Sequence, residues 1–470
     1  MTSYCMTLLE QHRSQLQELT MPDCGNEGIA ILLLSRCDID VDPWTGRRRC
    51  KLISHAVLPV SPEHVESCSP THITYSNRCV IPALKRAGEE NLIVAVVHSH
   101  RQQVPEFSVR DDTAEAGVHE LCRHRNGHDT ELVSIIMLPD GEVSARVWVG
   151  DGTPHEISSI RILGDTWRFQ GQAAFPTLVS DAQRRQVLAF GPEFSQLMAG
   201  LRFGVVGCGA TGTATAEFLI QHGAQFIAVF DRDIVERSNV SRMHGARIQD
   251  ADDRALKVDI VHRMAVETGL RTQVIRFPHW VDQPECQDAL KSLDVVFCCS
   301  DDHSGRLFLN RFAYFYATPT IDMGVVIDPA VDRPGQLLAA EGRVTVLLPG
   351  TRCFLCRGVI DPLVARDETL YRQNPTEYSR RQRHGYVRRF DIPNPAVGWQ
   401  TTAVATMAFE ELVHRLTGFR HRGHADHRVR KFLLMEDKFP GVKSSGTCRI
   451  CERQDYWGRG DMRPFLDRAG

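Results

Sequence analysis

The stretch RFGVVGCGATGTATAEFLIQHGAQFIAVFD, residues 202–231, decides the fold of the larger part of this chain. An apolar run precedes Gly207, Gly209 and Gly212, a helical pattern follows them, and a second apolar run ends at Asp231. Glycines at this spacing make a tight strand-to-helix turn and let a phosphate approach the first amides of the helix. Because the motif stands in the strand–turn–helix context that it requires, we predict a doubly wound α/β fold with a nucleotide site.

A dense set of polar side chains follows the second apolar run. Asp231 lies 19 residues after Gly212 and is placed to hydrogen-bond a ribose hydroxyl, which would also suit a dinucleotide oxidoreductase. Adenylation fits the rest of the set better, because it needs cations around a triphosphate and a carboxylate to hold Mg2+. The members of this set are Asp233, Ser238, Asn239, Arg242, Lys257, Asp301, Asp302, Arg306 and Asn310.

Single members of the set have plainer interpretations. Arg242 and Lys257 alone would be solvated surface charges, and Asp301 alone would be a helix cap. The ordered combination across residues 207–310 is what favours a nucleotide-adenylating domain.

A second signature lies near the start of the chain. His98 and His100 follow the apolar run IVAVV, and residues i and i+2 at a strand end face the same way. With Asp111 they predict an open zinc site of two imidazoles, one carboxylate and one water, whose pKa the metal would lower. Glu27, just before the strand GIAILLL, is the candidate general base, and Ser108 either stabilises an oxyanion or caps the helix near Asp111. The plain alternative is a surface His-x-His beside a helix-starting aspartate.

The remaining motif is a pair of Cys-x-x-Cys knuckles about 90 residues apart. Four thiolates favour a closed, structural zinc site that ties the end of the chain back to the fold. A redox disulfide is the rival, but neither pair opens a helix after a strand as a thioredoxin-type motif does. The knuckles are Cys353, Cys356, Cys448 and Cys451.

No cysteine lies between Cys356 and Cys448. The polar, Arg-rich stretch 361–393 is predicted to be an irregular, mobile loop. We expect Cys208, Cys298 and Cys299, in the glycine loop and in a buried strand, to be core residues rather than nucleophiles.

The two signatures resemble two known families. The block over about residues 1–150 resembles the JAMM (JAB/MPN) metalloproteases, which implies zinc on His98, His100 and Asp111, Glu27 as general base, and release or C-terminal processing of ubiquitin-like proteins. Arg101 departs from that pattern, because a proline often follows the second histidine.

The second half resembles the ThiF/MoeB and ubiquitin-activating enzyme superfamily. The resemblance implies that Asp231 holds the ribose and Asp301 supports Mg2+, while the phosphates are handled by Ser238, Asn239, Arg242 and Lys257. It also implies that Arg185 reaches the ATP of a partner subunit, hence a homodimer, and that the cysteine knuckles bind zinc. In that superfamily the cysteine that takes a thioester usually lies in the crossover loop, which is cysteine-free here, so we expect the acyl-adenylate to pass to another protein's thiol.

We therefore expect a JAMM-like zinc isopeptidase domain over 1–155, a linker and helical lead-in over 156–200, and a ThiF-like adenylation domain over 201–470. Strands are predicted at Ile29–Leu34, Ile93–Val97, Leu132–Leu138, Ser144–Val149 and Asp294–Ser300. Helices are predicted over the N-terminal MTSYCMTLLEQHRSQLQEL, Asn77–Glu90, Asp111–His124, the stretch 180–201 and Pro395–Thr417.

Composition sets the outer bounds. The 470 residues carry a formal net charge of only −3, which gives no strong case for nucleic acid or an anionic membrane. The absence of a long apolar run and of a secretion leader, together with fifteen cysteines, predicts a cytoplasmic protein with reduced thiols.

The function expected from these features is bifunctional: ATP-dependent adenylation of the C-terminus of a ubiquitin-like protein, and hydrolysis of the bond after that C-terminus. Expected cofactors are ATP, Mg2+ and Zn2+, and the expected partner is a thiol-bearing conjugating enzyme, in a setting such as bacterial ubiquitin-like conjugation and phage defence. One alternative is activation of a sulfur-carrier protein that works with a sulfurtransferase. Another is a non-catalytic scaffold that binds ubiquitin-like tails.

Overall fold

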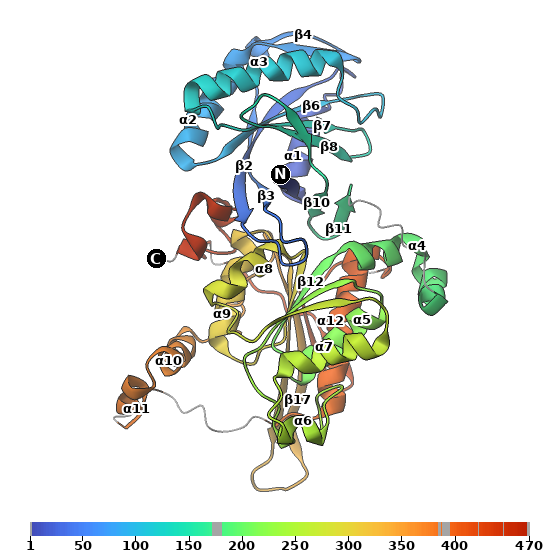
Figure 1. The fold of residues 1–470 in the computed structure, drawn as a ribbon, viewed down its shortest axis with the longest axis vertical. Helices are drawn as coiled ribbons and strands as arrows, with labels where there is room; N and C mark the ends of the chain where they lie inside the picture. The colour runs from blue at the N-terminus through green and yellow to red at the C-terminus, as the bar shows by residue number, and fades with distance from the viewer. Residues whose placement is uncertain are drawn as a thin grey trace. The chain divides into compact units, whose positions relative to one another are not determined.

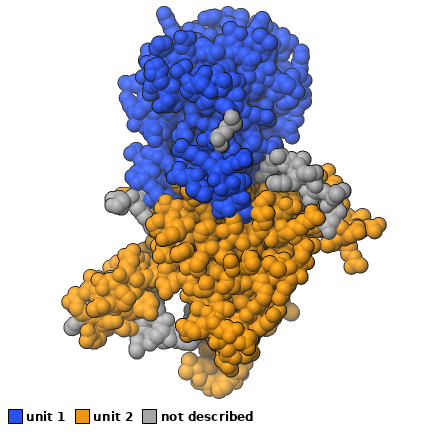
Figure 2. All heavy atoms as spheres, in the orientation of Figure 1, with its two compact units in different colours: residues 1–173, 315–317, 455–470 blue, residues 174–314, 318–454 orange. Residues whose placement is uncertain are grey.

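The computed structural model describes residues 2–171, 181–383, 387, 395–421, 423–444 and 446–467. It divides into two compact units (Figure 1, Figure 2), which are described separately. Unit 1 comprises residues 1–173, 315–317 and 455–470, and unit 2 comprises residues 174–314 and 318–454. Among the described residues, no helix is both long enough and apolar enough to cross a membrane.

Unit 1 is built on a nine-stranded mixed sheet with the order β11-β10-β1-β3-β2-β6-β7-β8-β9. A separate two-stranded hairpin pairs β4 (Val65–Ser69) with β5 (His72–Tyr75). The helices are α1 (Glu10–Thr20), α2 (Ile81–Glu90) and α3 (Val109–Asn126). The strands of the large sheet are β1 (Ser3–Leu9), β2 (Ile29–Ile39), β3 (Arg49–Pro59), β6 (Ile93–Ser99), β7 (Leu132–Met137), β8 (Val143–Trp148), β9 (Pro154–Glu156), β10 (Ile160–Leu163) and β11 (Trp167–Gln170).

The central strand β2 is buried on both faces, which explains its uninterrupted apolar sequence. Leu32 lies in one hydrophobic cluster with Leu16 of α1. Ile31 lies in a second cluster with Leu84 of α2 and Val118 of α3. Successive residues of a strand point to opposite faces, so α1 covers one side of this part of the sheet while α2 and α3 cover the other.

The four strands expected in this half are confirmed as β2, β6, β7 and β8, with ends that differ by up to five residues. The N-terminal helix was predicted too long: its first half, Ser3–Leu9, is strand β1. β1 pairs in parallel with β3 and with β10, and its Met6 and Leu8 enter the core. Pairing with distant strands thus outweighs the local helical pattern. The predicted helix at 77–90 begins with a 3-10 turn, and α2 proper starts at Ile81.

Unit 2 is built on an eight-stranded sheet with the order β14-β13-β12-β15-β16-β17-β18-β19. The first five strands run parallel, and the pairs from β16 onward are antiparallel. The strands are β12 (Arg202–Val206), β13 (Phe226–Phe230), β14 (Gln273–Phe277), β15 (Val295–Cys298), β16 (Thr320–Pro329), β17 (Leu337–Leu347), β18 (His427–Lys431) and β19 (Glu436–Lys438).

Helices lie on both sides of this sheet, with α5, α7 and α12 on one side and α8 and α9 on the other (Figure 1). The chain runs from β12 to β13 and β14, then returns to place β15 on the other side of β12. In such sheets ligands bind at the carboxyl ends of the strands where the order reverses. The helices are α4 (Arg184–Gly200), α5 (Ala210–Gln221), α6 (Ile248–Asp252), α7 (Lys257–Thr268), α8 (Gln287–Ser292), α9 (His303–Phe315), α10 (Pro362–Gln373), α11 (Pro375–Arg383) and α12 (Gly398–Thr417).

The predicted irregular loop at 361–393 is wrong over its first part, because α10 and α11 occupy it up to Arg383. Asp361 caps α10 by accepting a hydrogen bond from Leu363 N, and Pro362 takes the first helical position. Residues 384–386 and 388–393 of that stretch lie outside the described residues.

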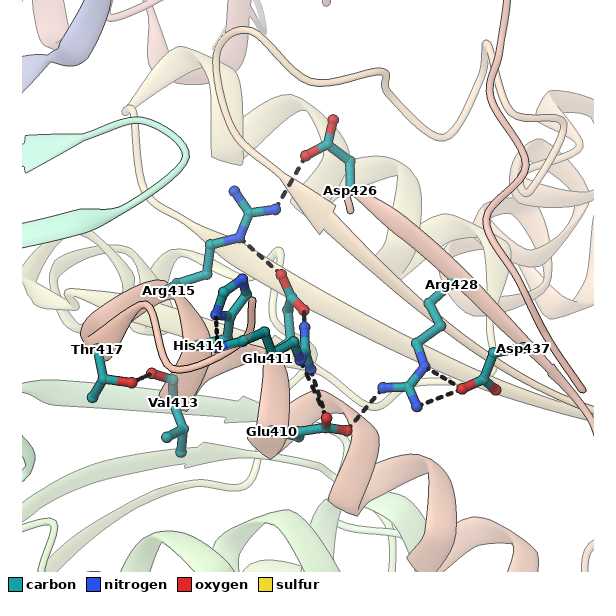
Figure 3. A network of polar contacts seen from close by, with 10 residues as sticks. Glu410, Glu411, Val413, His414, Arg415, Thr417, Asp426, Arg428 and Asp437 are labelled. Carbon is teal, nitrogen blue, oxygen red and sulfur yellow. Dashed lines mark hydrogen bonds and ion pairs between the residues drawn. The ribbon is translucent and has the colours of Figure 1, made fainter. Parts of the chain in front are cut away.

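Ion pairs fix the second half of α12 to the antiparallel end of the sheet (Figure 3). Arg415 is fully buried, and its guanidinium contacts Glu411 at 2.9 Å and Asp426 at 3.1 Å. Arg428 of β18 contacts Glu410 of α12 at 2.8 Å. Because a buried guanidinium without its partners would be costly, this network holds α12 in one position on the sheet.

Candidate functional sites

The predicted metal ligands of unit 1 converge. His98 Nε2 lies 3.4 Å from Asp111 Oδ1, His100 Nε2 lies 3.7 Å from Asp111 Oδ2, and the two Nε2 atoms are 3.1 Å apart. His100 Nδ1 lies 2.8 Å from the carbonyl oxygen of Val104, and a hydrogen bond there puts the ring proton on Nδ1. Burial lowers the pKa of His98 to about 4, so the ring is neutral near pH 7. Two imidazoles and one carboxylate therefore lie within reach of one ion, and this donor set suits Zn2+.

Asp111 is oriented by the helix that it starts. Ser108 is the N-cap of α3: its Oγ accepts from Asp111 N at 3.2 Å, and its own N donates to Asp111 Oδ2 at 2.7 Å. The capping role that the sequence suggested for Ser108 is therefore present. A hydroxyl that accepts in a cap keeps its proton to donate, so Ser108 can also face an oxyanion.

Glu27 lies in the same pocket as His100 and Asp111, and the Glu27 side chain is largely buried. Burial raises the pKa of Glu27 to about 7, which matches the range in which a carboxylate exchanges protons with water near neutral pH. The pocket is lined by Glu27, Thr71, His72, Ile73, His100, Arg101, Gln102, Val104, Glu106, Ser108, Arg110 and Asp111.

Two contributions to this site were not predicted. The β4–β5 hairpin supplies Thr71, His72 and Ile73 to the pocket, and only the fold brings it there. The guanidinium of Arg146 lies 3.9 Å from the ring centroid of Phe107, and the rings of Phe107 and His98 make a T-shaped contact with centroids 6.4 Å apart. A cation stacked on an aromatic side chain carries no local sequence signal.

The glycine loop of unit 2 lies between β12 and α5, where the strand order reverses. Gly207 has φ of +89°, and a side chain there would approach the backbone of Cys299 and Ser300 to 2.9 Å. A side chain at Gly212 would collide with the carbonyl oxygen of Gly207. At Gly209, by contrast, a Cβ would meet no described atom within 4 Å, which leaves that amide open to a ligand.

Asp231 closes the other side of the loop at the end of β13. Its carboxylate accepts from the backbone N of Cys208 at 2.7 Å and of Asp233 at 2.8 Å. Burial raises the pKa of Asp231. Lys257, at the start of α7, contacts Asp233 at 2.9 Å. Each carboxylate oxygen of Asp231 accepts one of these bonds and retains a lone pair for a ribose hydroxyl.

The predicted phosphate-binding residues lie on the turn after β13. Asn239 Oδ1 accepts from Glu236 N at 3.0 Å, and Arg242 donates to the carbonyl oxygen of Ser238 at 2.8 Å. These contacts define the turn 236–242. Asp301 is exposed beyond the end of β15, and Arg185 is exposed on α4.

Arg306 and Asn310, which were grouped with the nucleotide residues, have partners within the protein. Arg306 contacts the fully buried Asp322 at 3.0 Å, and Arg343 contacts the same carboxylate at 2.6 Å. Asn310 Oδ1 accepts from Phe354 N at 2.8 Å. Asp302 also has a local role, because it accepts from Gly305 N and so caps α9.

The four knuckle cysteines converge in unit 2. Cys353 Sγ lies 3.7 Å from Cys448 Sγ, and Cys356 Sγ lies 3.6 Å from Cys451 Sγ. A tetrahedron with Zn–S bonds of about 2.3 Å places its sulfur atoms roughly 3.8 Å apart. The four-thiolate arrangement therefore fits a closed zinc site.

Comparison with known proteins covers the second half of the chain. The SAMP-activating enzyme E1 of Haloferax volcanii is 28% identical over 168 residues, which are 35% of this chain and 56% of that protein. The adenylyltransferase and sulfurtransferase UBA4 of Meyerozyma guilliermondii is 23% identical over 242 residues, which are 50% of this chain and 46% of that protein. The chain spans about half the length of the curated relatives it matches.

The crystal structure of E. coli MccB with ATP aligns with a TM-score of 0.44 and 13% identity, and covers 58% of this chain and 74% of that chain. The model of the ThiF family matches residues 183–450, which is more than half of the 470 residues. Unit 2 is thus a Rossmann-like ThiF domain, and the chain belongs to the ThiF family.

Proposed function

We propose that this protein adenylates the C-terminal carboxylate of a ubiquitin-like or sulfur-carrier protein in unit 2 and hydrolyses the bond after such a C-terminus in unit 1. The observation that carries the first activity is the glycine loop with Asp231 and Lys257 at the switch point of a ThiF-family sheet. Relatives named as SAMP-activating and ubiquitin-like modifier-activating enzymes support the choice of substrate. We propose that the JAMM-like hydrolase domain is unit 1 and the adenylation domain is unit 2, for which the sequence suggested residues 1–155 and 201–470 with a lead-in over 156–200.

In the adenylation step, a carboxylate oxygen of the substrate attacks the α-phosphorus of ATP. The bond between that phosphorus and the bridging oxygen breaks, and pyrophosphate leaves. Asp231 would hold the ribose, and Arg242 and Lys257 would neutralise the phosphates together with Ser238 and Asn239. Mg2+, when bound near Asp301, would shield the charge that builds on the leaving group.

The activated carboxylate needs an acceptor. The segment from α10 to α12 holds no cysteine, and Cys208, Cys298 and Cys299 are buried, with thiol pKa values that burial raises. Buried, protonated thiols are poor nucleophiles. Cys24 and Cys68 are exposed but belong to unit 1. We therefore propose that the acceptor is a thiol on a partner, either a conjugating enzyme or a sulfurtransferase. Relatives named adenylyltransferase and sulfurtransferase support the sulfur-transfer alternative.

In unit 1, His98, His100 and Asp111 would hold Zn2+ in the manner of a JAMM metalloprotease. Zn2+, when bound, supplies Lewis acidity to the amide carbonyl and acidifies a water. Glu27 would accept the proton of that water and deliver it to the leaving amine, and Ser108 Oγ would donate to the oxygen of the tetrahedral intermediate. The convergence of these side chains in one pocket supports this half of the proposal.

The adenylation half is tested by ATP–pyrophosphate exchange with purified ubiquitin-like and sulfur-carrier proteins. We expect exchange that depends on one of these substrates and that falls at least 100-fold in Asp301→Ala. Asp302→Ala, which removes the neighbouring carboxylate that caps α9, is the matched control and should retain exchange. Exchange that is unaffected in Asp301→Ala would remove Asp301 from the Mg2+ site.

The hydrolytic half is tested by counting zinc and by cleavage. Wild-type protein should hold two zinc ions per chain, and either His100→Ala or Cys451→Ser should remove one. A panel of ubiquitin-like proteins with C-terminal peptide extensions, read by intact mass, should include one that is cleaved by the wild type and not by Glu27→Gln. If zinc is absent from unit 1 and no extension is removed, unit 1 is a scaffold that binds tails.

Arg185 provides a test of the proposed homodimer. If Arg185 serves the ATP of a partner subunit, Arg185→Ala and Asp301→Ala chains should each be inactive in exchange. Mixing them should restore exchange, because a mixed dimer has one intact site. The absence of any recovery in verified mixed dimers would place Arg185 in its own subunit's site or outside the site.

A further inference from the structure

The strand end that carries the two histidines has a second face with a different set of contacts. Residues 98–101 alternate: His98 and His100 direct Nε2 towards Asp111, whereas Ser99 and Arg101 contact the segment 20–28. The opposite directions of His98 and Ser99 follow from the two-residue period of β6, and Arg101 lies in the turn after that strand.

Hydrogen bonds from Ser99 and Arg101 go to backbone atoms of that segment. Ser99 Oγ donates to the carbonyl oxygen of Thr20 at 2.6 Å and accepts from Gly28 N at 3.1 Å. Arg101 Nε donates to the carbonyl oxygen of Asn26 at 2.9 Å, and an Arg101 terminal nitrogen donates to that of Pro22 at 2.5 Å.

Glu27 lies at the centre of these contacts. Arg101 holds Asn26 on one side of Glu27, and Ser99 holds Gly28 on the other. Glu27 N itself donates to the carbonyl oxygen of Ser69 at 2.8 Å. A side chain on Gly28 would approach the carbonyl oxygen of Thr20 to 2.7 Å, so the backbones pack directly there. The segment 21–27 has no helix or strand of its own to hold it.

We propose that Arg101 is a positioning residue that fixes the Glu27 carboxylate relative to the cluster of His98, His100 and Asp111. The planar guanidinium reaches two carbonyl oxygens at once, which an ammonium group cannot do with the same geometry. The end of β6 and the turn after it would then fix both the two histidines and Glu27. The proposal rests on the proposed hydrolytic function of unit 1.

The test compares Arg101→Ala with the wild type as full-length, zinc-loaded chains. Hydrogen exchange read by mass spectrometry should quicken about 10-fold or more in peptides covering 20–28 and stay unchanged in peptides covering 93–97. Zinc content should not change. With the extended ubiquitin-like protein that the wild type cleaves fastest, kcat should fall about 10–100-fold with KM within about twofold, because displacement of a catalytic group by about 1 Å has that effect.

Two variants serve as comparisons. Arg101→Lys should restore part of kcat, because one carbonyl contact can re-form. Arg86→Ala removes a half-buried arginine of α2 that makes two hydrogen bonds to Glu90, and it should leave kcat and the hydrogen exchange of peptides covering 20–28 unchanged.

The outcomes separate the two proposals. Unchanged exchange over 20–28 in Arg101→Ala overturns the positioning role, whether or not a cleavable substrate exists. A raised KM with unchanged kcat would also overturn it, since Arg101 would then act on the substrate. Cleavage that survives Glu27→Gln would instead overturn the hydrolytic mechanism.

Discussion

The three glycines of the nucleotide loop have different physical roles. Gly207 is required by its positive φ, and Gly212 by the close approach of α5 to the loop. Gly209 has ordinary extended dihedrals and open space around its Cβ position. Contacts within the protein thus explain why Gly207 and Gly212 must be glycine. Only an incoming ligand explains Gly209.

This difference predicts opposite phenotypes for two alanine substitutions. Gly212→Ala should destabilise unit 2 by about 1–3 kcal/mol, because the added methyl group must displace α5 from the Gly207 carbonyl. Gly209→Ala should leave stability unchanged and weaken ATP binding at least 10-fold, because its methyl group occupies the phosphate approach. Urea unfolding and calorimetric titration with ATP measure the two effects. Normal ATP affinity in Gly209→Ala would show that the phosphates bind elsewhere.

Residue types and spacing were enough to predict that His98, His100 and Asp111 converge and that a glycine loop follows β12. His98, His100 and Asp111 are brought together by one strand end and the helix that follows it, so their proximity is a local property of the chain. The partners of Arg306 could not be predicted in this way. Asp322 and Arg343 meet it only because β16 and β17 pair beneath α9, and an arginine five residues after Asp301 looks the same in sequence whether it binds phosphate or a buried carboxylate.

At the scale of elements, the largest error concerns the first twenty residues. The predicted single helix is a strand followed by a helix, and the junction at Leu9 is held by a side chain from β3. Ser54 Oγ accepts from Leu9 N at 2.9 Å and lies 2.9 Å from His12 Nδ1. Hydrophobic periodicity alone does not reveal this contact, since its partner is about 40 residues away.

The junction gives unit 1 a pH dependence. Burial lowers the pKa of His12 to about 4, with the neighbouring charge of His55 acting in the same direction. An unfolded histidine titrates near 6.5, so the stabilisation is complete above about pH 6.5 and is lost as the pH falls towards 4. The largest possible contribution is about 3 kcal/mol.

The measurement is hydrogen exchange of the α1 peptides between pH 7 and 4.5, corrected for intrinsic rates. Wild-type α1 should lose protection as the pH falls, and His12→Phe should lose much less. His124→Phe, which alters an exposed histidine, should follow the wild type. An equal pH slope in His12→Phe and the wild type would assign the loss to other groups.

At the scale of the whole molecule, unit 1 is not a continuous stretch of chain. Its compact core includes residues 315–317 and 455–470, so the C-terminal segment belongs with the N-terminal sheet. Trp457 O lies 3.1 Å from His55 Nδ1, and Gly458 O accepts from Ser35 Oγ at 2.6 Å. A fragment cut at the apparent domain boundary would therefore lack part of the unit.

Loss of Asp461 should show most clearly that the C-terminal segment is part of unit 1. Its carboxylate accepts from Asp38 N at 2.6 Å and from the hydroxyl of the fully buried Tyr316 at 2.9 Å, so it joins all three segments of unit 1. Asp461→Ala removes an acceptor from the buried Tyr316 hydroxyl and from the partly buried Asp38 N, which should destabilise unit 1 by about 1–3 kcal/mol. Hydrogen exchange of the β2 and β3 peptides should quicken, while hydrogen exchange of the β12 and α5 peptides stays as in the wild type.

Asp455→Ala is the matched control, because Asp455 is half-exposed and its contact with Arg459 is 3.6 Å long. A long contact to a half-exposed carboxylate contributes at most about 1 kcal/mol. Deleting residues 455–470 should raise hydrogen exchange of the β2 and β3 peptides more than Asp461→Ala does. The deletion should also reduce cleavage by unit 1 more than it reduces pyrophosphate exchange by unit 2. If the deletion leaves β2 and β3 fully protected, residues 1–173 are an independent domain and the C-terminal segment only rests on it.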